Sequence, residues 1–254
     1  MTPATIFEID IPLLRNLQRV QLDILLKPEA DLKVERWDDM LDCFAAVGQA
    51  GGFGEVSPAF RGAEPRPVSG APASLRYVFS AAGIQWGTWR VLANLCAAYA
   101  SANALVQRIA LTGQGIGDRL GPPISTFEKL QSLPYPVRPA AVGFTCDITA
   151  NVHETGSLYM RIGLLRAVDD QEIEALAALL ANWVEVVNGG YPDADMEADE
   201  SVMDATELYA LSHSTLEMRV PFFNASYDAW EAVIGMLHWH DLRTPLIESF
   251  TVSP

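Results

Sequence analysis

The chain has 254 residues, half of them hydrophobic, and carries a formal net charge of −15 from 32 acidic and 17 basic residues. The hydrophobic content excludes an intrinsically disordered chain, which would lack the apolar side chains needed for a core. The negative charge argues against a nucleic acid or an anionic membrane as partner, because the average field of such a surface repels both. The same field attracts and steers a basic protein.

The first ten residues contain neither a basic stretch nor an apolar run, so we expect no secretory signal. No apolar segment approaches the ~18 residues that cross a bilayer. Three widely spaced cysteines, Cys43, Cys96 and Cys146, lie within apolar helix or strand patterns. We therefore expect free, buried thiols and a cytoplasmic protein in a reducing compartment.

The first 112 residues begin with two predicted strands and a helix. A short strand is expected at 7–11, and apolar alternation predicts a half-buried strand at 20–26. An apolar stripe with helical spacing follows over 34–48. It ends at Gly51-Gly52, where glycine suits the left-handed geometry that often follows a helix.

A strand, a helix and a strand complete this part of the chain. After a Pro/Gly-rich loop at 54–72, strands are predicted at 75–79 and 105–111, with a helix around 89–96 between them. Two strands joined by a helix in this way should run parallel, with a right-handed crossover.

Residues 113–141 contain nine glycines and prolines and are predicted to be a linker. A short helix around 125–130, with Ser125 as its N-cap, is expected within it. The segment Gly113–Gly117 follows a strand, as a nucleotide-binding loop does. However, Asp118–Pro123 come next in place of the helix that a pyrophosphate site needs, which favours the linker.

From residue 142 the same order of elements returns. Residues 144–148 match 7–11 at a separation of 137 positions, and the helical stripe 173–187 matches 34–48 at 139. The last three elements match at 141. The clearest match is a set of alternating apolar residues 138 positions apart: Val20, Leu22, Ile24 and Leu26 with Leu158, Met160, Ile162 and Leu164.

These matches predict an internal duplication. We interpret residues 1–112 as a first α+β repeat, 113–141 as a Pro/Gly-rich linker, and 142–254 as a second α+β repeat. The order of elements is typical of a ferredoxin-like fold, the split βαβ arrangement, with an extra N-terminal strand in each half. A fold of this kind carries no function by itself.

An acidic segment in the second half is the main candidate for a binding surface. It lies within the loop 192–206, and its carboxylates are Asp193, Asp195, Glu197, Asp199 and Glu200. Calcium loops need a glycine at their sharp turn, and this segment has none, which disfavours a metal site. A solvated connector and a docking surface for a basic partner stay open, and we take these five residues as the candidate partner-binding residues.

Histidines and aspartates elsewhere give weaker signals. His238 and His240 point about 200° apart on a helix, so they cannot share one metal, and a histidine near a helix C-terminus complements the helix dipole. Asp10 and Asp147 match each other in the proposed repeat, and two facing carboxylates could share a proton. No nucleophile or oxyanion donor accompanies them, so we expect exposed aspartates.

The sequence contains no nucleophile elbow, no phosphate-binding loop, no His-Glu-x-x-His and no Cys-x-x-Cys. We therefore expect no catalytic residue, no metal ligand and no cofactor. The favoured function is a non-catalytic acidic binding protein, such as a bacterial immunity-type inhibitor that caps a basic toxin. A small-molecule enzyme or ligand-binding protein with a pocket between the halves is the alternative, and a structural subunit of a larger assembly is the third.

Overall fold

The computed structural model describes most of the chain, namely residues 5–27, 34–54, 66–68, 71–80, 85–102, 106–149, 157–189, 203–205, 207–223 and 227–254. Within these residues the protein is a mixed α+β structure with two five-stranded sheets, one two-stranded sheet and five helices. None of the described helices is both long and apolar enough to span a membrane.

The first sheet has the strand order β1-β5-β2-β4-β3. Its strands are β1 (Ile6–Asp10), β2 (Leu14–Leu26), β3 (Arg66–Val68), β4 (Ala71–Ser80) and β5 (Val106–Arg119). β1 and β5 pair in parallel, and every other neighbouring pair is antiparallel. The strands predicted to run parallel, β4 and β5, do run in the same direction, but β2 lies between them.

The second sheet has the order β6-β12-β7-β10-β9. Its strands are β6 (Thr145–Ile148), β7 (Leu158–Leu164), β9 (Tyr209–Ser212), β10 (Thr215–Val220) and β12 (Ile247–Ser253). β6 and β12 pair in parallel, and the other neighbours are antiparallel, as in the first sheet. A small separate ribbon pairs β8 (Met203–Asp204) with β11 (Phe222–Phe223).

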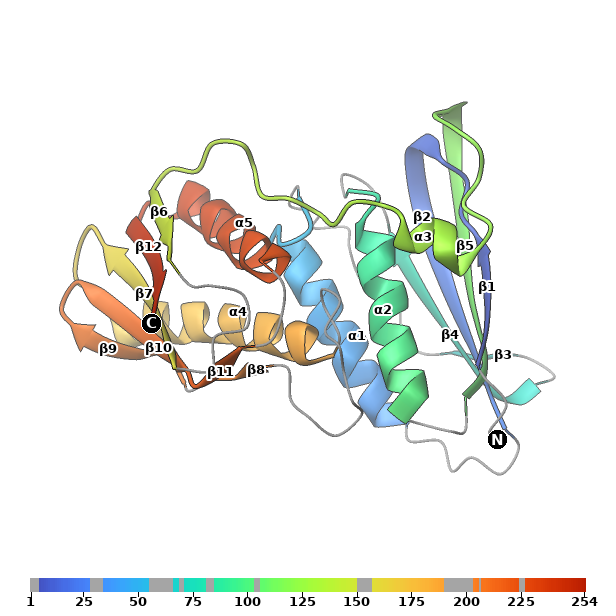
Figure 1. The fold of residues 1–254 in the computed structure, drawn as a ribbon, viewed down its shortest axis with the longest axis horizontal. Helices are drawn as coiled ribbons and strands as arrows, with labels where there is room; N and C mark the ends of the chain where they lie inside the picture. Colours follow the sequence, from blue (N-terminus) through green and yellow to red (C-terminus); the bar gives the residue numbers. More distant parts are fainter. Residues whose placement is uncertain are drawn as a thin grey trace.

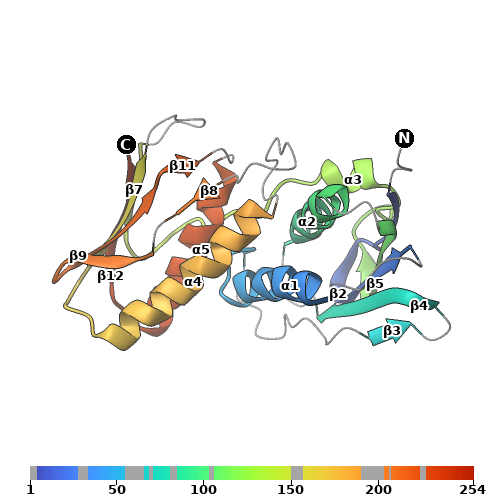
Figure 2. The same cartoon turned by 90° about the horizontal axis from the view of Figure 1, so that it is seen from below.

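The helices lie between the two sheets, so that the molecule has four layers (Figures 1 and 2). The helices are α1 (Val34–Gln49), α2 (Thr88–Ala102), α3 (Phe127–Gln131), α4 (Asp170–Asn188) and α5 (Asp228–Arg243). α1 and α2 cover the first sheet, α4 and α5 cover the second, and α1 contacts α4 across the middle. α3 is a short helix beside β1, where the rings of Phe7 and Phe127 are 4.6 Å apart.

The alternating residues of β2 and β7 form the centre of the hydrophobic core. All of those marked by the sequence pattern are buried: Val20, Leu22, Ile24, Leu26, Leu158, Met160, Ile162 and Leu164. Burying an apolar side chain of this size contributes about 1.5–3 kcal/mol, so these two strands fix both sheets against their helices. Trp89 on α2 and Trp230 on α5 are buried too, as their helical spacing indicates.

The register of the sheets corrects one part of the sequence comparison. Ile9 lies opposite Leu111 in the first sheet, and Ile148 lies opposite Val252 in the second. Since Leu111 and Val252 are 141 positions apart, as in the predicted match, Ile148 takes the place of Ile9 at a separation of 139. The predicted match of 7–11 with 144–148 was therefore two residues out of register.

The predicted linker begins in regular structure. β5 continues to Arg119, so the glycine-rich stretch is a strand paired with β2. A Cβ atom on Gly115 would lie 2.4 Å from the carbonyl oxygen of Asn16, so glycine permits the two backbones to approach closely. The short helix follows as expected, but its N-cap is Thr126 rather than Ser125: the Thr126 hydroxyl accepts from the Lys129 backbone N–H at 3.2 Å.

The rest of the linker is bound to both halves. The Gln85 side chain donates to the Val137 carbonyl at 2.9 Å and accepts from the Val137 N–H at 3.0 Å. One residue later, the Arg138 backbone N–H donates to Glu231 on α5 at 3.1 Å. These contacts fix the path of the connection although its prolines prevent regular structure.

The glycines at the ends of α1 and α4 differ in backbone conformation. Gly51 has φ = 92°, the left-handed geometry predicted, and a Cβ there would lie 2.1 Å from Trp239 on α5. Trp239 also donates its indole N–H to the Gly54 carbonyl at 2.9 Å, so this turn packs directly on the other half. Gly189, the C-cap of α4, has φ = −72° and keeps right-handed helical geometry.

All three cysteines are free, as expected. Cys96 is fully buried, but Cys43 and Cys146 are only half-buried, which differs from the prediction. Burial raises the pKa of all three thiols, so none is favoured as a thiolate.

Candidate functional site

A largely apolar groove of about 510 Å³ runs along α4. Its α4 wall consists of Ile173, Glu174, Ala177, Ala178, Ala181, Val184 and Glu185. The opposite wall consists of Ala205, Glu207 and Leu208, which precede β9, and of Met218 on β10. Small alanines on the helix and larger apolar side chains opposite them leave an open channel between the helix and the second sheet.

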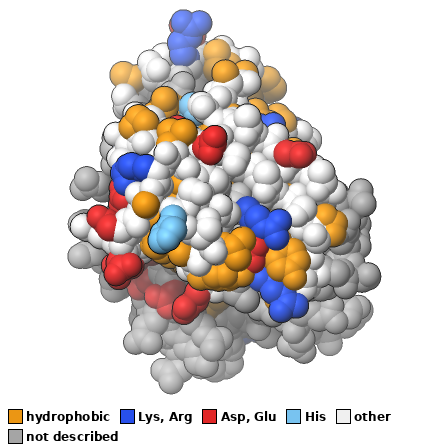
Figure 3. All heavy atoms as spheres, turned by 90° about the vertical axis from the view of Figure 1, so that its left-hand side faces the viewer, with side chains coloured by type: hydrophobic (Ala, Val, Ile, Leu, Met, Phe, Trp, Pro, Cys, Tyr) orange, Lys and Arg blue, Asp and Glu red, His pale blue; other side chains and the backbone are white. Residues whose placement is uncertain are grey.

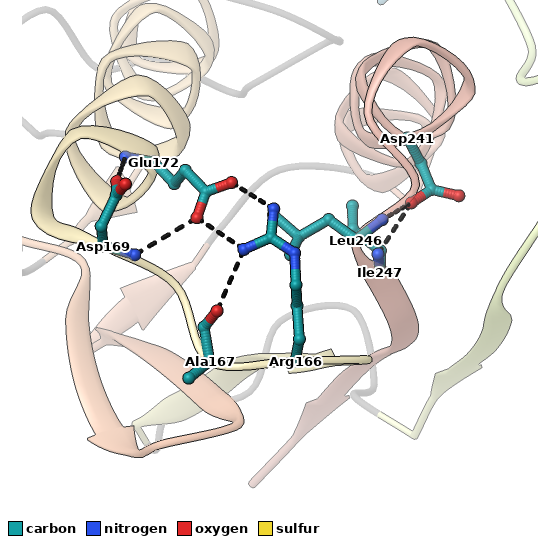
Figure 4. A network of polar contacts seen from close by, with 7 residues as sticks. All are labelled: Arg166, Ala167, Asp169, Glu172, Asp241, Leu246 and Ile247. Carbon is teal, nitrogen blue, oxygen red and sulfur yellow. Dashed lines mark hydrogen bonds and ion pairs between the residues drawn. The ribbon is translucent and has the colours of Figure 1, made fainter.

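The N-terminal end of α4 is held rigidly. Asp169 caps the helix by accepting from the Glu172 N–H at 2.9 Å, and the Glu172 carboxylate accepts from the Asp169 N–H at 3.2 Å. The Arg166 guanidinium forms a two-pronged ion pair with Glu172, one contact of which is 2.8 Å (Figure 4). A helix fixed in this way presents its groove face in one orientation.

Among the described residues, all the ionisable side chains that line the groove are acidic. They are Glu174, Glu185 and Glu207, each of them exposed. Carboxylates at the edge of an apolar channel attract a cation and leave the floor free for an apolar group. The groove therefore combines apolar contact area with a negative rim.

The corresponding region of the first half is closed by a hydrogen bond. Tyr77 on β4 donates its hydroxyl to Asp38 on α1 at 2.9 Å, and burial followed by this contact raises the pKa of Tyr77. In the sequence comparison Met218 takes the place of Tyr77 and Ala177 the place of Asp38. The second half therefore has two apolar side chains of smaller reach where the first half has a hydrogen-bonded pair, which leaves room for the groove beside α4.

One end of the groove reaches the contact between the halves. Glu185 on α4 lies close enough to Cys43 on α1 to raise the pKa of that thiol, after the larger effect of burial. Gly189, at the end of α4, approaches Leu95 on α2 so closely that a Cβ would lie 2.7 Å from its Cδ2 atom. A segment bound along the groove would therefore end near α1.

Comparison with known proteins identifies no family for this chain. No protein-family model matches it, and no curated protein does. The solved structure of a protease from Helicobacter pylori is a weak match, with 11% sequence identity and a TM-score of 0.21 over 89% of this chain and 75% of that one. At that TM-score no property of the protease is carried over.

The acidic residues predicted to bind a partner lie outside the described residues. These are Asp193, Asp195, Glu197, Asp199 and Glu200, within the range 190–200. Their segment connects two parts of the chain that do line the groove, Glu185 near the end of α4 and Ala205 before β9. The three groove glutamates were not predicted. The small alanines beside the apolar stripe of α4 are a signal for Glu174 and Glu185 on that helix, but Glu207 lies outside α4 and far from both in sequence.

His238 and His240 both lie near the C-terminal end of α5. His238 is buried, while burial lowers the pKa of His240 and so favours its neutral form, which opposes the predicted interaction with the helix dipole. Asp241 accepts from the backbone N–H groups of Leu246 and Ile247, both at 2.7 Å, and thereby fixes the start of β12 (Figure 4). In the described part of the chain no three His, Cys, Asp or Glu side chains gather as a metal site.

Asp10 and Asp147 are not partners. Asp10 lies opposite Thr112 in the first sheet and Asp147 opposite Thr251 in the second, so the register makes Glu8 the counterpart of Asp147. The two sheets lie on opposite sides of the helices, which excludes a shared proton (Figure 1). Both aspartates are exposed, as expected.

The outer face of the second sheet carries charges of both signs (Figure 3). At its centre Glu217 is buried and accepts from Arg161 at 2.6 Å and from the Tyr209 hydroxyl. The Arg161 guanidinium lies 5.4 Å from the Tyr159 ring centroid. A face with such neutralised charges is a weaker candidate for a basic partner than the uniformly acidic groove.

Proposed function

We propose that this protein is a non-catalytic acidic binding protein of the cytoplasm, of the bacterial immunity type, that caps a basic protein partner such as a toxin. The observation that carries the proposal is the α4 groove, an apolar channel whose described ionisable lining residues are all glutamates. Charge complementarity between such a rim and a basic partner steers association and selects the partner.

The groove fits an amphipathic segment of the partner. Its α4 wall extends from Ile173 to Glu185, which is about 18 Å at the rise of an α-helix. Between three and four turns of a partner helix would cover that length, with apolar side chains toward Ala177 and Ala181 and lysines or arginines toward the glutamates. Helices commonly bind in grooves in this way.

The acidic segment is the second part of the proposed surface. Asp193, Asp195, Glu197, Asp199 and Glu200 would add five carboxylates to the three of the groove. The segment lies between Glu185 and Ala205 in the sequence, and both of these residues line the groove. Its carboxylates would therefore add to the negative field that acts on the bound partner.

We also infer that the chain arose by duplication of a ferredoxin-like half. The support is the shared strand order and the shared register: Leu22 lies opposite Tyr77 and Leu111, as Met160 lies opposite Met218 and Val252. In this account the second half acquired the groove while the first retained the Tyr77–Asp38 contact.

A synthetic peptide can test the groove before the natural partner is known. The probe is a fluorescent amphipathic helix of leucine and lysine, with a leucine and glutamate peptide of the same pattern as the control peptide. We expect saturable one-to-one binding of the lysine peptide only, measured by fluorescence anisotropy. Ala181→Arg, which places a cation in the channel, should weaken binding at least tenfold.

The matched control is Ala175→Arg, which adds the same side chain at an exposed position of α4 that does not line the groove. Arginine is a good helix former, so both variants should keep the fold, which circular dichroism and thermal melting would verify. Equal affinity of the two variants for the lysine peptide would contradict the groove as the binding site.

A further inference from the structure

A second cavity lies at one end of the first sheet, away from the α4 groove. It measures about 240 Å³ and is lined by Asp10, Pro12, Leu13, Gly113, Arg119, Gly121 and Pro123. Its walls come from the end of β1, from β5 and from the start of the linker. The glycine-rich strand at the start of the predicted linker therefore forms part of a cavity.

Backbone hydrogen bonds hold these walls in place. Ile11 and Ile124 exchange two bonds, of 3.0 and 2.9 Å, and the Leu120 N–H donates to the Leu13 carbonyl at 2.7 Å. Proline at positions 12 and 123 further restricts the backbone. The cavity is thus a preformed feature of the fold, and binding there would not need to order a loop.

Two opposite charges line the cavity without neutralising each other. Among the described residues, neither Asp10 nor Arg119 has an ion pair or a side-chain hydrogen bond. Five other arginines do have a carboxylate within 4.0 Å: Arg76, Arg108, Arg138, Arg161 and Arg166. The Arg119 guanidinium and the Asp10 carboxylate are therefore both free to bind a ligand.

We propose that this cavity binds a small zwitterion, a molecule that carries one carboxylate and one ammonium group. The ligand carboxylate would accept from the Arg119 guanidinium, whose paired N–H groups match a carboxylate, and the ligand ammonium would donate to Asp10. The volume equals about eight water molecules at ~30 Å³ each, which suits a ligand the size of a free amino acid.

The charges of the cavity disfavour ions of a single sign. A simple anion beside Arg119 would be repelled by Asp10, and a simple cation beside Asp10 would be repelled by Arg119. A zwitterion gains from both side chains and adds no net charge. This inference is independent of the proposed function of the α4 groove.

The test uses the standard amino acids as probes. Each is titrated against the intact protein by isothermal calorimetry, and the best ligand is then compared with its methyl ester and its N-acetyl derivative. We expect at least one amino acid to bind with one-to-one stoichiometry. Blocking either charged group should weaken binding at least tenfold, because each modification removes one of the two ionic contacts.

Variants of the protein test the same contacts from the other side. Arg119→Gln and Asp10→Asn should each weaken binding at least tenfold, while Arg15→Gln and Asp118→Asn, exposed neighbours outside the cavity, should leave it unchanged. Absence of binding by every amino acid at millimolar concentration would overturn the proposal. So would a ligand whose affinity survives both cavity substitutions in folded protein.

Discussion

At the scale of single residues, the two sheets use the same cross-strand ion pair with the charges exchanged. Asp23 lies opposite Arg76 in the first sheet, and Arg161 lies opposite Glu217 in the second. Both pairs have a closest contact of 2.6 Å. An opposite-charge pair therefore occupies this position in both sheets, although the two residues are exchanged. The matches between the two halves of the sequence were drawn from apolar residues, so they could not reveal this pair.

The two pairs should differ in strength, because the Glu217 side chain is 5% exposed and the Asp23 side chain 25%. Glu217→Gln removes the charge of a buried side chain and so weakens its contacts with Arg161 and Tyr209. It should lower the free energy of unfolding by about 1–3 kcal/mol. Asp23→Asn, the matched control, should cost about 0.5–1 kcal/mol. Urea denaturation measures both, and a larger loss for Asp23→Asn would contradict this ranking.

The cap of α4 should make stability depend on pH. Hydrogen bonding to Arg166 lowers the pKa of Glu172 to about 2, below its value in an unfolded chain. The stabilisation is therefore complete above the unfolded pKa and is lost progressively as pH falls from about 5 toward 2. Glu172→Gln keeps the capping geometry without the charge, so its stability difference from wild type should shrink over that range. A constant difference would contradict the ionic contribution.

At the scale of elements, the turn after α1 depends on one glycine. Gly51 combines a positive φ with close packing on Trp239, so Gly51→Ala should destabilise the protein by about 2–4 kcal/mol through backbone strain and steric overlap. Gly121→Ala is the control, because a Cβ there meets only Leu13 at 3.4 Å. Equal melting temperatures of the two variants would show that the turn accommodates a side chain.

The strands and helices with strong apolar periodicity could be predicted from the sequence. In β2, β7 and α4 the side chains on one face are buried, so apolar residues recur at the period of a strand or a helix. This period can be seen in the sequence. The extension of β5 could not be predicted in this way. Glycine usually breaks regular structure, but here Gly115 serves the close approach of β2, a tertiary contact that the local sequence does not contain.

The groove was beyond prediction for a similar reason. Glu174 and Glu185 are ordinary exposed residues in the pattern of α4, and Glu207 is far from them in sequence. Only the fold brings the three to one channel. The composition indicates that the protein is acidic, but only the structure shows where acidic side chains border an apolar surface.

At the scale of the whole molecule, two similarly built halves differ in the space beside α1 and α4. Their helix layers pack together and leave both sheets on the outside (Figure 2). The first half closes the space beside α1 with the Tyr77–Asp38 hydrogen bond, and the second leaves the α4 groove open. With a net charge of −15, the long-range field of the molecule would bring a basic partner toward this surface.

The salt dependence of association tests this account most directly. Stopped-flow measurements with the leucine and lysine peptide would compare wild type with the groove variant Glu174→Gln/Glu185→Gln/Glu207→Gln. The control variant, Asp118→Asn/Asp147→Asn/Glu248→Gln, removes the same three charges at exposed positions outside the groove. The wild-type and control rate constants should fall steeply as the Debye length shrinks from ~30 Å to ~8 Å.

The groove variant should associate more slowly than the control at low salt and depend less on salt, while keeping the same melting behaviour. A further variant changes the carboxylates of the acidic segment to their amides, at Asp193, Asp195, Glu197, Asp199 and Glu200. Its association rate constant measures how much this segment contributes to the attraction of the peptide. If the groove and control variants associate at the same rate at every salt concentration, the effect belongs to net charge alone and the account of a groove built for a basic partner is wrong.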